Sequence, residues 1–307
     1  MQLRYDEDLV EDAVFTCAAR RRDLPALQIA RFHRAREKLY RILDPEQRNH
    51  AFFQLHLEWF REWGLEQRLL TLVREFPLLP QTLSLLGIRK ARAAKEEAAE
   101  LYVQDSGAAT GILALRPERF LPDSRLEVFL RHELTHLHDM LDPAFGYSRQ
   151  IGAAGVNPAQ QRLAFERYRL LWDITIDARL ADRGLTPAVG RPQHAAAFAG
   201  AYSFLPEEKR DELFDRLWQP QPPRHAWLAE LACDPRGLRA VSQAVPGAAC
   251  PLCSFPTFDW VLPGQVSPAL TSRIQREFPA WTPDHGLCGR CLHIYQVVLR
   301  ASKSSGS

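Results

Sequence analysis

The chain has 307 residues, 46% of them hydrophobic and 25% charged, which is the composition of a globular protein of two or three domains. A formal net charge of +2 gives no overall field that favours nucleic acid or a membrane. The opening "MQLRYDEDLVED" lacks the apolar core of a signal peptide, and no apolar run approaches the roughly 18 residues that cross a bilayer. A cytoplasmic protein that does not bind membranes is therefore expected.

Residues 1–99 are predicted to form an N-terminal helical region. Apolar residues recur at spacings of three and four in "DLPALQIARFHRAREKLYRIL" and in "HAFFQLHLEWFREWGLEQRLLTLVREF". After an interruption that contains two prolines, "IRKARAAKEEAAELYV" is rich in strong helix formers and is also predicted to be helical. The basic residues between Arg20 and Lys38 could contact phosphate groups, but the acidic residues among them favour a solvated helix face.

The central region, residues 100–218, is predicted to contain a short strand followed by two long helices. The run "TGILAL" has the character of a strand. A helix follows it, with Asp123 or Ser124 as its N-cap and Pro143 after its end. The second helix begins near residue 159 and is closed by Gly184. This order of elements predicts a fold that is mainly α with a small β-sheet.

The first of these helices contains "RHELTHLHD", in which His132 and His136 are four residues apart. Residues at this spacing lie on nearly the same face of a helix, so both imidazoles can bind one metal ion. Glu133 lies about 100° round the helix, where it can take a proton from a water molecule at the open position of the ion. The alternative is a surface helix with two hydrogen-bonded histidines, but the apolar "LEVFL" before the motif favours a buried helix.

Through "HELTH" and its surroundings, residues 100–185 resemble the zincin superfamily of metallopeptidases. The resemblance implies an α+β core with a catalytic zinc held by His132 and His136, and Glu133 as the general base. It also implies that the strand-like segment before the helix binds an extended peptide substrate.

Two regions could supply the third zinc ligand. The first directly follows the motif, and its candidate ligand is Asp142. It stands where the metzincin branch has its third ligand. Asp139 replaces the glycine that lets the chain turn in that branch, and the methionine turn has no counterpart, because the chain contains only Met1 and Met140. Asp139 lies on the same stripe of the helix as His132, one turn beyond His136, and is expected to support a ligand or to cap the helix.

The second region is on the second long helix, where Asp173 and Asp177 are four residues apart on an apolar arc. A buried carboxylate has to be paired or bind a metal. The gluzincin branch, to which thermolysin belongs, has Glu-x-x-x-Asp on such a helix. This resemblance implies that Asp173 is the ligand and that Asp177 holds a ligand histidine. Because Asp is one methylene shorter than Glu, the two roles could be exchanged, and an Arg169–Asp173 ion pair is the alternative without metal.

The C-terminal region, residues 219–307, begins with the linker-like "QPQPPRH" and contains the pairs Cys250–Cys253 and Cys288–Cys291. Four thiolates can hold one structural zinc ion, as in a zinc ribbon; a redox dithiol or two unrelated thiol pairs are the alternatives. The long segment 254–287 between the pairs is expected to have structure of its own. Its aromatic residues would form a small core: Phe255, Phe258, Trp260, Phe278 and Trp281.

A zincin followed by a zinc ribbon resembles the domain order of SprT-like proteases, which act on DNA-bound proteins, although their third ligand histidine has no equivalent here. The leading interpretation is a zinc-dependent peptidase that acts on peptides or proteins, with one catalytic and one structural zinc. Tyr147 is the first candidate to stabilise the oxyanion, ahead of Tyr168, Tyr202, His194 and His225. The alternatives are a non-catalytic adaptor and a regulator that binds nucleic acid through the ribbon.

Overall fold

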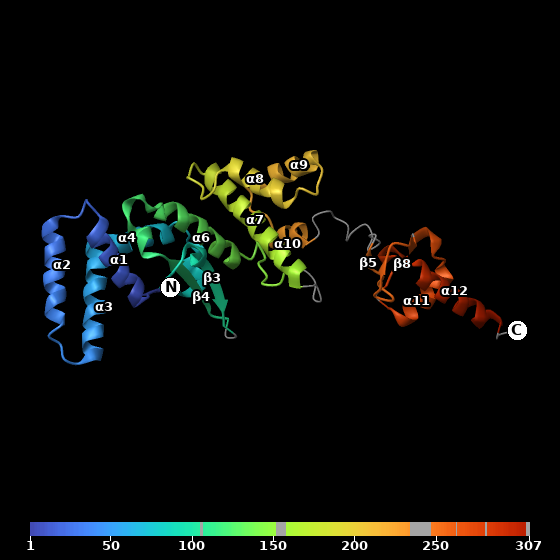
Figure 1. Cartoon of the computed structure of the whole chain (residues 1–307), viewed down its shortest axis with the longest axis horizontal. Coiled ribbons are helices and arrows are strands. Elements are labelled where there is room, and N and C mark those ends of the chain that lie inside the picture. The colour runs from blue at the N-terminus through green and yellow to red at the C-terminus, as the bar shows by residue number, and fades with distance from the viewer. Residues whose placement is uncertain (105–106, 152–157, 234–246, 262, 280, 305–307) are drawn as a thin grey trace. The chain divides into compact units, whose positions relative to one another are not determined.

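A computed structural model describes residues 1–104, 107–151, 158–233, 247–261, 263–279 and 281–304. The chain forms two compact units, Met1–Ala232 and Cys233–Ser307. Helices predominate in the described residues, and the strands form small sheets (Figure 1). The prediction of a mainly α fold with a small β-sheet is confirmed. None of the helices described here is both long enough and apolar enough to cross a membrane.

The first unit contains a sheet with the strand order β1-β2-β4-β3. The strands β1 (Gln2–Tyr5), β2 (Leu83–Lys90) and β4 (Ala109–Leu115) are parallel to one another, and β3 (Ala98–Val103) runs antiparallel to β4 at the edge. The strand predicted from "TGILAL" is confirmed as part of β4. A boundary between an N-terminal region and a central region was expected at residue 99. One sheet spans it, because β1 and β2 precede residue 99 and β3 extends beyond it.

The helix predicted over "IRKARAAKEEAAELYV" is wrong. Its first residues end β2 and its last residues form β3, with a short 3₁₀ turn at Ala94–Glu96 between them. Leu86 and Ile88 of β2 are buried, and β2 is hydrogen-bonded to a parallel strand on each side. These long-range pairings outweigh the helix propensity of the Ala, Lys and Glu residues that follow.

Five helices of the first unit lie between β1 and β2 in the sequence: α1 (Glu7–Arg20), α2 (Ala26–Leu39), α3 (Pro45–Glu62), α4 (Leu65–Arg74) and α5 (Leu78–Thr82). Gly64, with a φ of 72°, separates α3 from α4 within the stretch that was expected to be continuously helical. Asp6 and Asp44 cap α1 and α3 by accepting hydrogen bonds from backbone N–H groups of the first turn.

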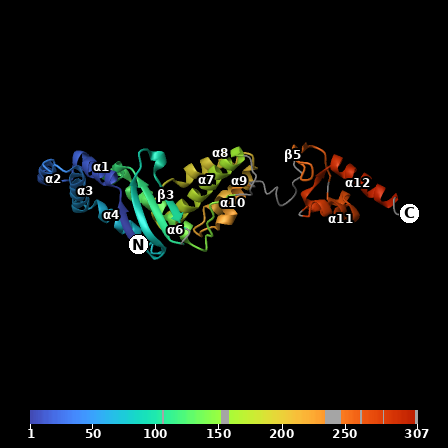
Figure 2. The same cartoon turned by 90° about the horizontal axis from the view of Figure 1, so that it is seen from below.

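Helix α6 (Leu126–Leu141) carries the "HELTH" motif and packs against the sheet (Figure 2). At the contact, a Cβ on Gly111 of β4 would lie only 3.0 Å from the side chain of Leu137, so glycine permits the close approach. The N-cap of α6 is Arg125, and the prediction of Asp123 or Ser124 is wrong. Both residues belong to a 3₁₀ turn, in which the Ser124 hydroxyl donates to the carbonyl of Leu121.

Helix α7 (Pro158–Asp182) lies beside α6 and is followed by Gly184 with a φ of 71°, which agrees with the predicted end. The first unit continues with three shorter helices, α8 (Arg191–Ala201), α9 (Glu207–Leu217) and α10 (His225–Cys233). Because the first unit extends to Ala232, the segment 219–225 connects helices within one unit, whereas the sequence suggested a linker between domains.

The second unit contains the short strands β5 (Ala248–Ala249), β6 (Pro256–Thr257), β7 (Trp260–Val261) and β8 (Leu287–Cys288) and the helices α11 (Pro268–Glu277) and α12 (Gly289–Ser304). Trp281 is buried with Leu270 and Ile274 in its core. The expectation that Phe255 and Phe258 join this core is wrong, since they are 66% and 81% exposed. Both flank the two-residue strand β6, which is too short to bury them.

Candidate metal centres

Helices α6 and α7 bring His132, His136 and Asp173 together. The Nε2 atoms of His132 and His136 lie 3.5 and 2.9 Å from Oδ1 of Asp173, and ligand atoms of all three residues lie within 4.8 Å of one another. Ligand atoms about 2.0–2.2 Å from a tetrahedral ion are roughly 3.3–3.6 Å apart. The three side chains therefore fit one metal ion, and they include the carboxylate that the gluzincin resemblance implied.

Asp177 holds His132 from the side opposite Asp173. Its Oδ1 lies 3.0 Å from Nδ1 of His132, so the Nε2 atom is left for a metal ion. The same carboxylate accepts hydrogen bonds from the backbone N–H groups of Ala188 and Val189, and Nε2 of His194 lies 2.8 Å from its Oδ2. Asp177 is fully buried. It thus occupies the place of a ligand's partner, and its contact with His194 was not foreseen from the sequence.

The carboxylates alter the protonation of His132. Burial disfavours the imidazolium, but hydrogen bonds to Asp173 and Asp177 outweigh it and raise the pKa of His132 to about 10. Burial also disfavours the charged form of both carboxyl groups, and their hydrogen bonds to histidines nevertheless lower the pKa of Asp173 and Asp177 well below the ordinary range. The cluster therefore favours a positive charge in its centre, which a proton or a metal ion can supply.

Asp139 contacts neither histidine of the motif directly. Its carboxylate accepts two hydrogen bonds from Arg179, at 2.8 and 2.6 Å, and one from Nε1 of Trp172 at 2.8 Å. The Trp172 ring is 4.4 Å from the ring of His136, at an angle of 82°. Asp139 therefore holds Trp172 against His136. The sequence could not predict this arrangement, because Trp172 and Arg179 are far from Asp139 along the chain and belong to no recognisable motif.

Asp142 is not among the residues brought together. It is the C-cap of α6, where its backbone N–H bonds to the carbonyl of His138. Its Oδ1 accepts a hydrogen bond from the N–H of Ala144 at 2.8 Å. These local bonds direct Asp142 into the turn after the helix, so the metzincin-like alternative has no geometric support.

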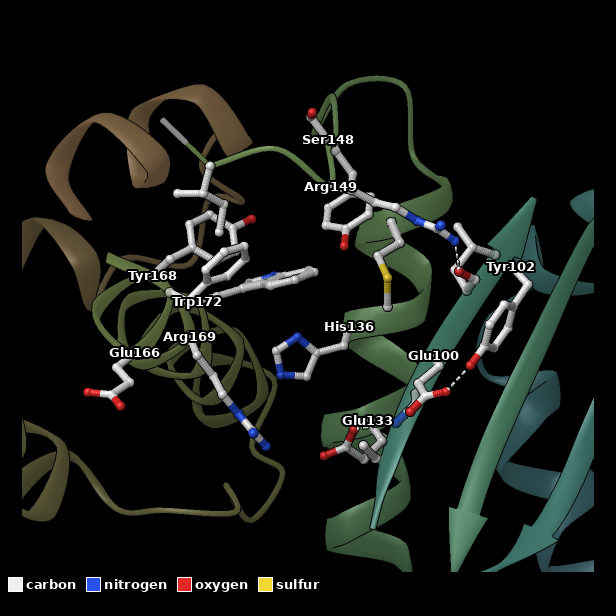
Figure 3. Close-up of a pocket in the computed structure, with 17 residues that line it drawn as sticks. Glu100, Tyr102, Glu133, His136, Ser148, Arg149, Glu166, Tyr168, Arg169 and Trp172 are labelled. Atoms are coloured by element: carbon white, nitrogen blue, oxygen red, sulfur yellow. Dashed lines mark hydrogen bonds between the residues drawn. The ribbon is translucent and has the colours of Figure 1, made fainter. Parts of the chain in front are cut away.

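A cavity of about 640 Å³ is lined by Glu133 and by one of the three candidate ligands, His136. The edge strand β3 forms one wall and α7 forms the other, so that Tyr102 and Glu100 face Trp172 across the cleft (Figure 3). Oε2 of Glu133 accepts a hydrogen bond from the backbone N–H of Ala99, at 2.8 Å. This bond, which links the predicted base to the edge strand, could not be read from the sequence.

Tyr147 also lines the cleft, with its ring 5.8 Å from that of Trp172. Burial raises the pKa of its phenol, so the hydroxyl keeps its proton and can donate a hydrogen bond. The hydroxyl of Tyr168 is engaged elsewhere, 2.6 Å from Nδ1 of His225. From the loop after α6, Arg149 donates a hydrogen bond to the carbonyl of Leu101 on β3. Of the two tyrosines, Tyr147 is therefore the better placed to act on a substrate.

The four cysteines of the second unit form the other group that could hold a metal ion. The sulfur atoms of Cys250 and Cys291 are 3.9 Å apart, and those of Cys253 and Cys288 are 3.8 Å apart. A disulfide requires about 2.05 Å, whereas thiolates about 2.3 Å from a tetrahedral ion are roughly 3.8 Å apart. The distances fit a four-thiolate metal site.

Backbone N–H groups favour a thiolate in this cluster. Burial disfavours the charged form of Cys250, but hydrogen bonds from backbone N–H groups outweigh it and lower the pKa of its thiol to about 7. The N–H of Cys288, for example, points at this sulfur from 3.4 Å. A lowered pKa makes the thiol a better metal ligand, because only the thiolate binds.

Comparisons of the chain with protein-family models, with curated proteins and with solved structures found no match.

Proposed function

We propose that the protein is a zinc-dependent peptidase whose catalytic ion is held by His132, His136 and Asp173. The proposal is carried by the convergence of these ligand atoms beside a cleft that Glu133 also lines. A purely structural metal site has no need of an adjoining cleft or of a carboxylate in its wall. Asp177 would fix His132, and Asp139 would act on His136 through Trp172.

Glu133 is the general base in this proposal. When bound, a zinc ion polarises the peptide carbonyl and lowers the pKa of water to about 7. Glu133 takes a proton from the attacking water and delivers it to the leaving amine. The Ala99 N–H holds Oε2 of the carboxylate, so its position is fixed before substrate arrives. The hydroxyl of Tyr147 donates a hydrogen bond to the developing oxyanion.

The substrate would be a peptide or an extended segment of a protein. One wall of the cleft is β3, an edge strand that is hydrogen-bonded to β4 on one side only. An extended peptide can add to such an edge through main-chain hydrogen bonds. To reach the carbonyl of Leu101 it would displace the side chain of Arg149. The scissile bond would lie near Ala99, where Glu133 meets the strand.

A second zinc ion is assigned to the four cysteines Cys250, Cys253, Cys288 and Cys291. Because all four tetrahedral positions would be filled by protein sulfur, this ion would be structural. Thiolates persist in a reducing compartment, which favours the cytoplasm as the location of the protein.

Replacement of the base tests the proposal. Glu133→Gln keeps the size and hydrogen-bonding capacity of the side chain but removes its basicity, so hydrolysis of a broad peptide library should fall about 10²–10⁴-fold. Zinc content and folding should not change. Glu166→Gln is the matched control, since Glu166 lines the same cleft and is exposed, and this variant should retain activity.

Equal cleavage by wild type and Glu133→Gln would identify the activity as a contaminant and reject the proposal. Wild type that binds zinc at His132 but cleaves no peptide or denatured protein would favour the adaptor instead.

A further inference from the structure

A second cavity, of about 380 Å³, lies among α1, α2 and α3 and shares no lining residue with the metal cleft. Its polar lining includes the carboxylates of Glu7, Asp8 and Glu11, the guanidinium of Arg36 and the imidazole of His56. No part of the proposed peptidase reaction uses these residues.

His56 is fully buried, and neither of its ring nitrogens makes a well-formed hydrogen bond; the backbone carbonyl of Phe52, one turn earlier in α3, is the polar group that acts on the ring. The rings of Phe15 and Phe32 lie 5.4 and 5.7 Å away and offer it no polar partner. Burial and the charge of Arg36 lower the pKa of His56 to about 4, so the ring is neutral near pH 7 and one nitrogen offers a lone pair. A buried polar group without a partner is costly, and a ligand in the cavity would supply one.

The lining residues include three carboxyl groups and one guanidinium. Burial raises the pKa of Glu11, so a cation beside it would favour its ionised form. Glu7 and Asp8 lie in the first turn of α1, where the helix dipole favours their ionised form. The nearby cation Lys90 forms an ion pair with Asp12, which is not part of the lining. The charge therefore favours a cationic ligand.

Arg36 restricts the kind of cation. Its guanidinium carbon lies 4.7 Å from the ring centre of Phe15, 5.2 Å from that of Tyr40 and 5.6 Å from that of Phe52. It thus occupies the aromatic faces that a methylated ammonium would need. A ligand has to be held by hydrogen bonds to carboxylates and to His56, which a primary ammonium with three N–H donors can make.

The donor atoms argue against a metal ion in this cavity. Within the part of the chain that the structure describes, residues whose ligand atoms are close enough to share one ion gather at the two centres described above, and neither group includes His56 or Glu11. An ammonium group can be held by two hydrogen-bond acceptors, and it therefore fits a site that lacks the three convergent ligand atoms that a metal ion requires.

We propose that this cavity binds a small protonated primary amine, whose ammonium group donates hydrogen bonds to Glu11 and to the neutral ring of His56. Glu7 and Asp8 attract the amine at the mouth of the cavity. This site is independent of the peptidase proposal, and either can fail without the other.

Titration of the zinc-loaded full chain with butylamine, followed by NMR, tests the site. Binding should be saturable, and it should weaken at least tenfold in Glu11→Gln and in His56→Phe, because each variant removes a hydrogen bond to a charged group. Glu37→Gln, on the exposed side of α2 and outside the lining, should bind butylamine like wild type. Butyltrimethylammonium, which has no N–H donors, should not bind.

Absence of saturable butylamine binding would overturn the proposal, and so would equal binding of the trimethylated amine. Unchanged binding in Glu11→Gln would overturn it as well. Thermal melting of each variant shows whether it folds, and Glu11→Gln decides the question if His56→Phe does not fold.

Discussion

At His132, two carboxylates outweigh the effect of burial, and the raised pKa of about 10 means that the imidazole carries a proton at pH 7. A metal ion binds only the neutral ring. We therefore expect zinc binding at this site to release about one proton at pH 7. Between pH 6 and pH 8, below the raised pKa, the affinity should increase about tenfold per pH unit.

Calorimetry in buffers of different ionisation enthalpy measures this proton release. The chain is first loaded with one equivalent of zinc at the cysteines, and His132→Ala serves as the control that lacks the site. If wild type and His132→Ala release the same number of protons, the metal does not displace the proton of His132.

Asp177 provides a second test at the scale of the residue. Asp177→Asn keeps the shape of the side chain but removes its negative charge. That charge holds the ring of His132 and stabilises a proton or metal ion bound to it. Loss of such a partner lowers metal affinity about 10–100-fold, as measured by competition with a chelator. Asp182→Asn, an exposed change on the same helix, should leave the affinity unaltered. Equal affinity in the two variants would show that Asp177 does not support metal binding through His132.

At the scale of the element, the edge strand β3 bears on the proposed catalysis through Ala99. Ala99→Pro removes the N–H that donates to Glu133, and proline is tolerated on an edge strand where the N–H points away from the sheet. We expect kcat to fall at least tenfold with unchanged zinc content. Val103→Pro, at another outward position of the same strand, is the matched control. Loss of activity in both variants would mean that the strand itself is disturbed.

Helices were easier to predict than strands because their pattern is local. The apolar spacing of α6 and α7 and the glycine after α7 predicted two helices whose facing sides carry the candidate ligands, and both helices are observed. The helix assignment failed for 88–103, where Ala, Lys and Glu are good helix formers. Strand β2 is buried by partners that lie about 80 residues before it and 25 after it, and β3 pairs with β4. Composition within a short window contains no information about such partners.

The same limit applies to the candidate site. Spacing within one helix could indicate His132 and His136, and the second helix could indicate Asp173 and Asp177. Contacts made across the fold could not be predicted in this way. The bond from Ala99 to Glu133 and that from Trp172 to Asp139 both join segments that are more than 30 residues apart.

At the scale of the whole molecule, the two candidate metal centres belong to separate compact units. We expect two zinc ions per chain that can be removed independently. His132→Ala should remove one ion and all hydrolysis, while Cys250→Ser should remove the other and unfold the small second unit. The described core of that unit is small and includes cysteines of the metal site. Its folding is therefore expected to depend on the bound metal ion.

Metal analysis together with scanning calorimetry measures both effects. Cys250→Ser should retain the thermal transition of the first unit. Loss of both ions from either single variant would show that the centres are coupled.

The parallel pairing of β1 has a consequence for the order in which the chain can fold during synthesis. Gln2 pairs with Leu85, so β1 is synthesised well before its partner, and five helices and then β2 must follow before the two strands can pair. With β4, the last strand of this sheet is complete at Leu115. The sheet can therefore form before Asp173 and Asp177 are translated, and the cysteines follow still later. Because folding during translation proceeds from the N-terminus, the growing chain can assemble its scaffold before it has the full set of groups that would capture a metal ion.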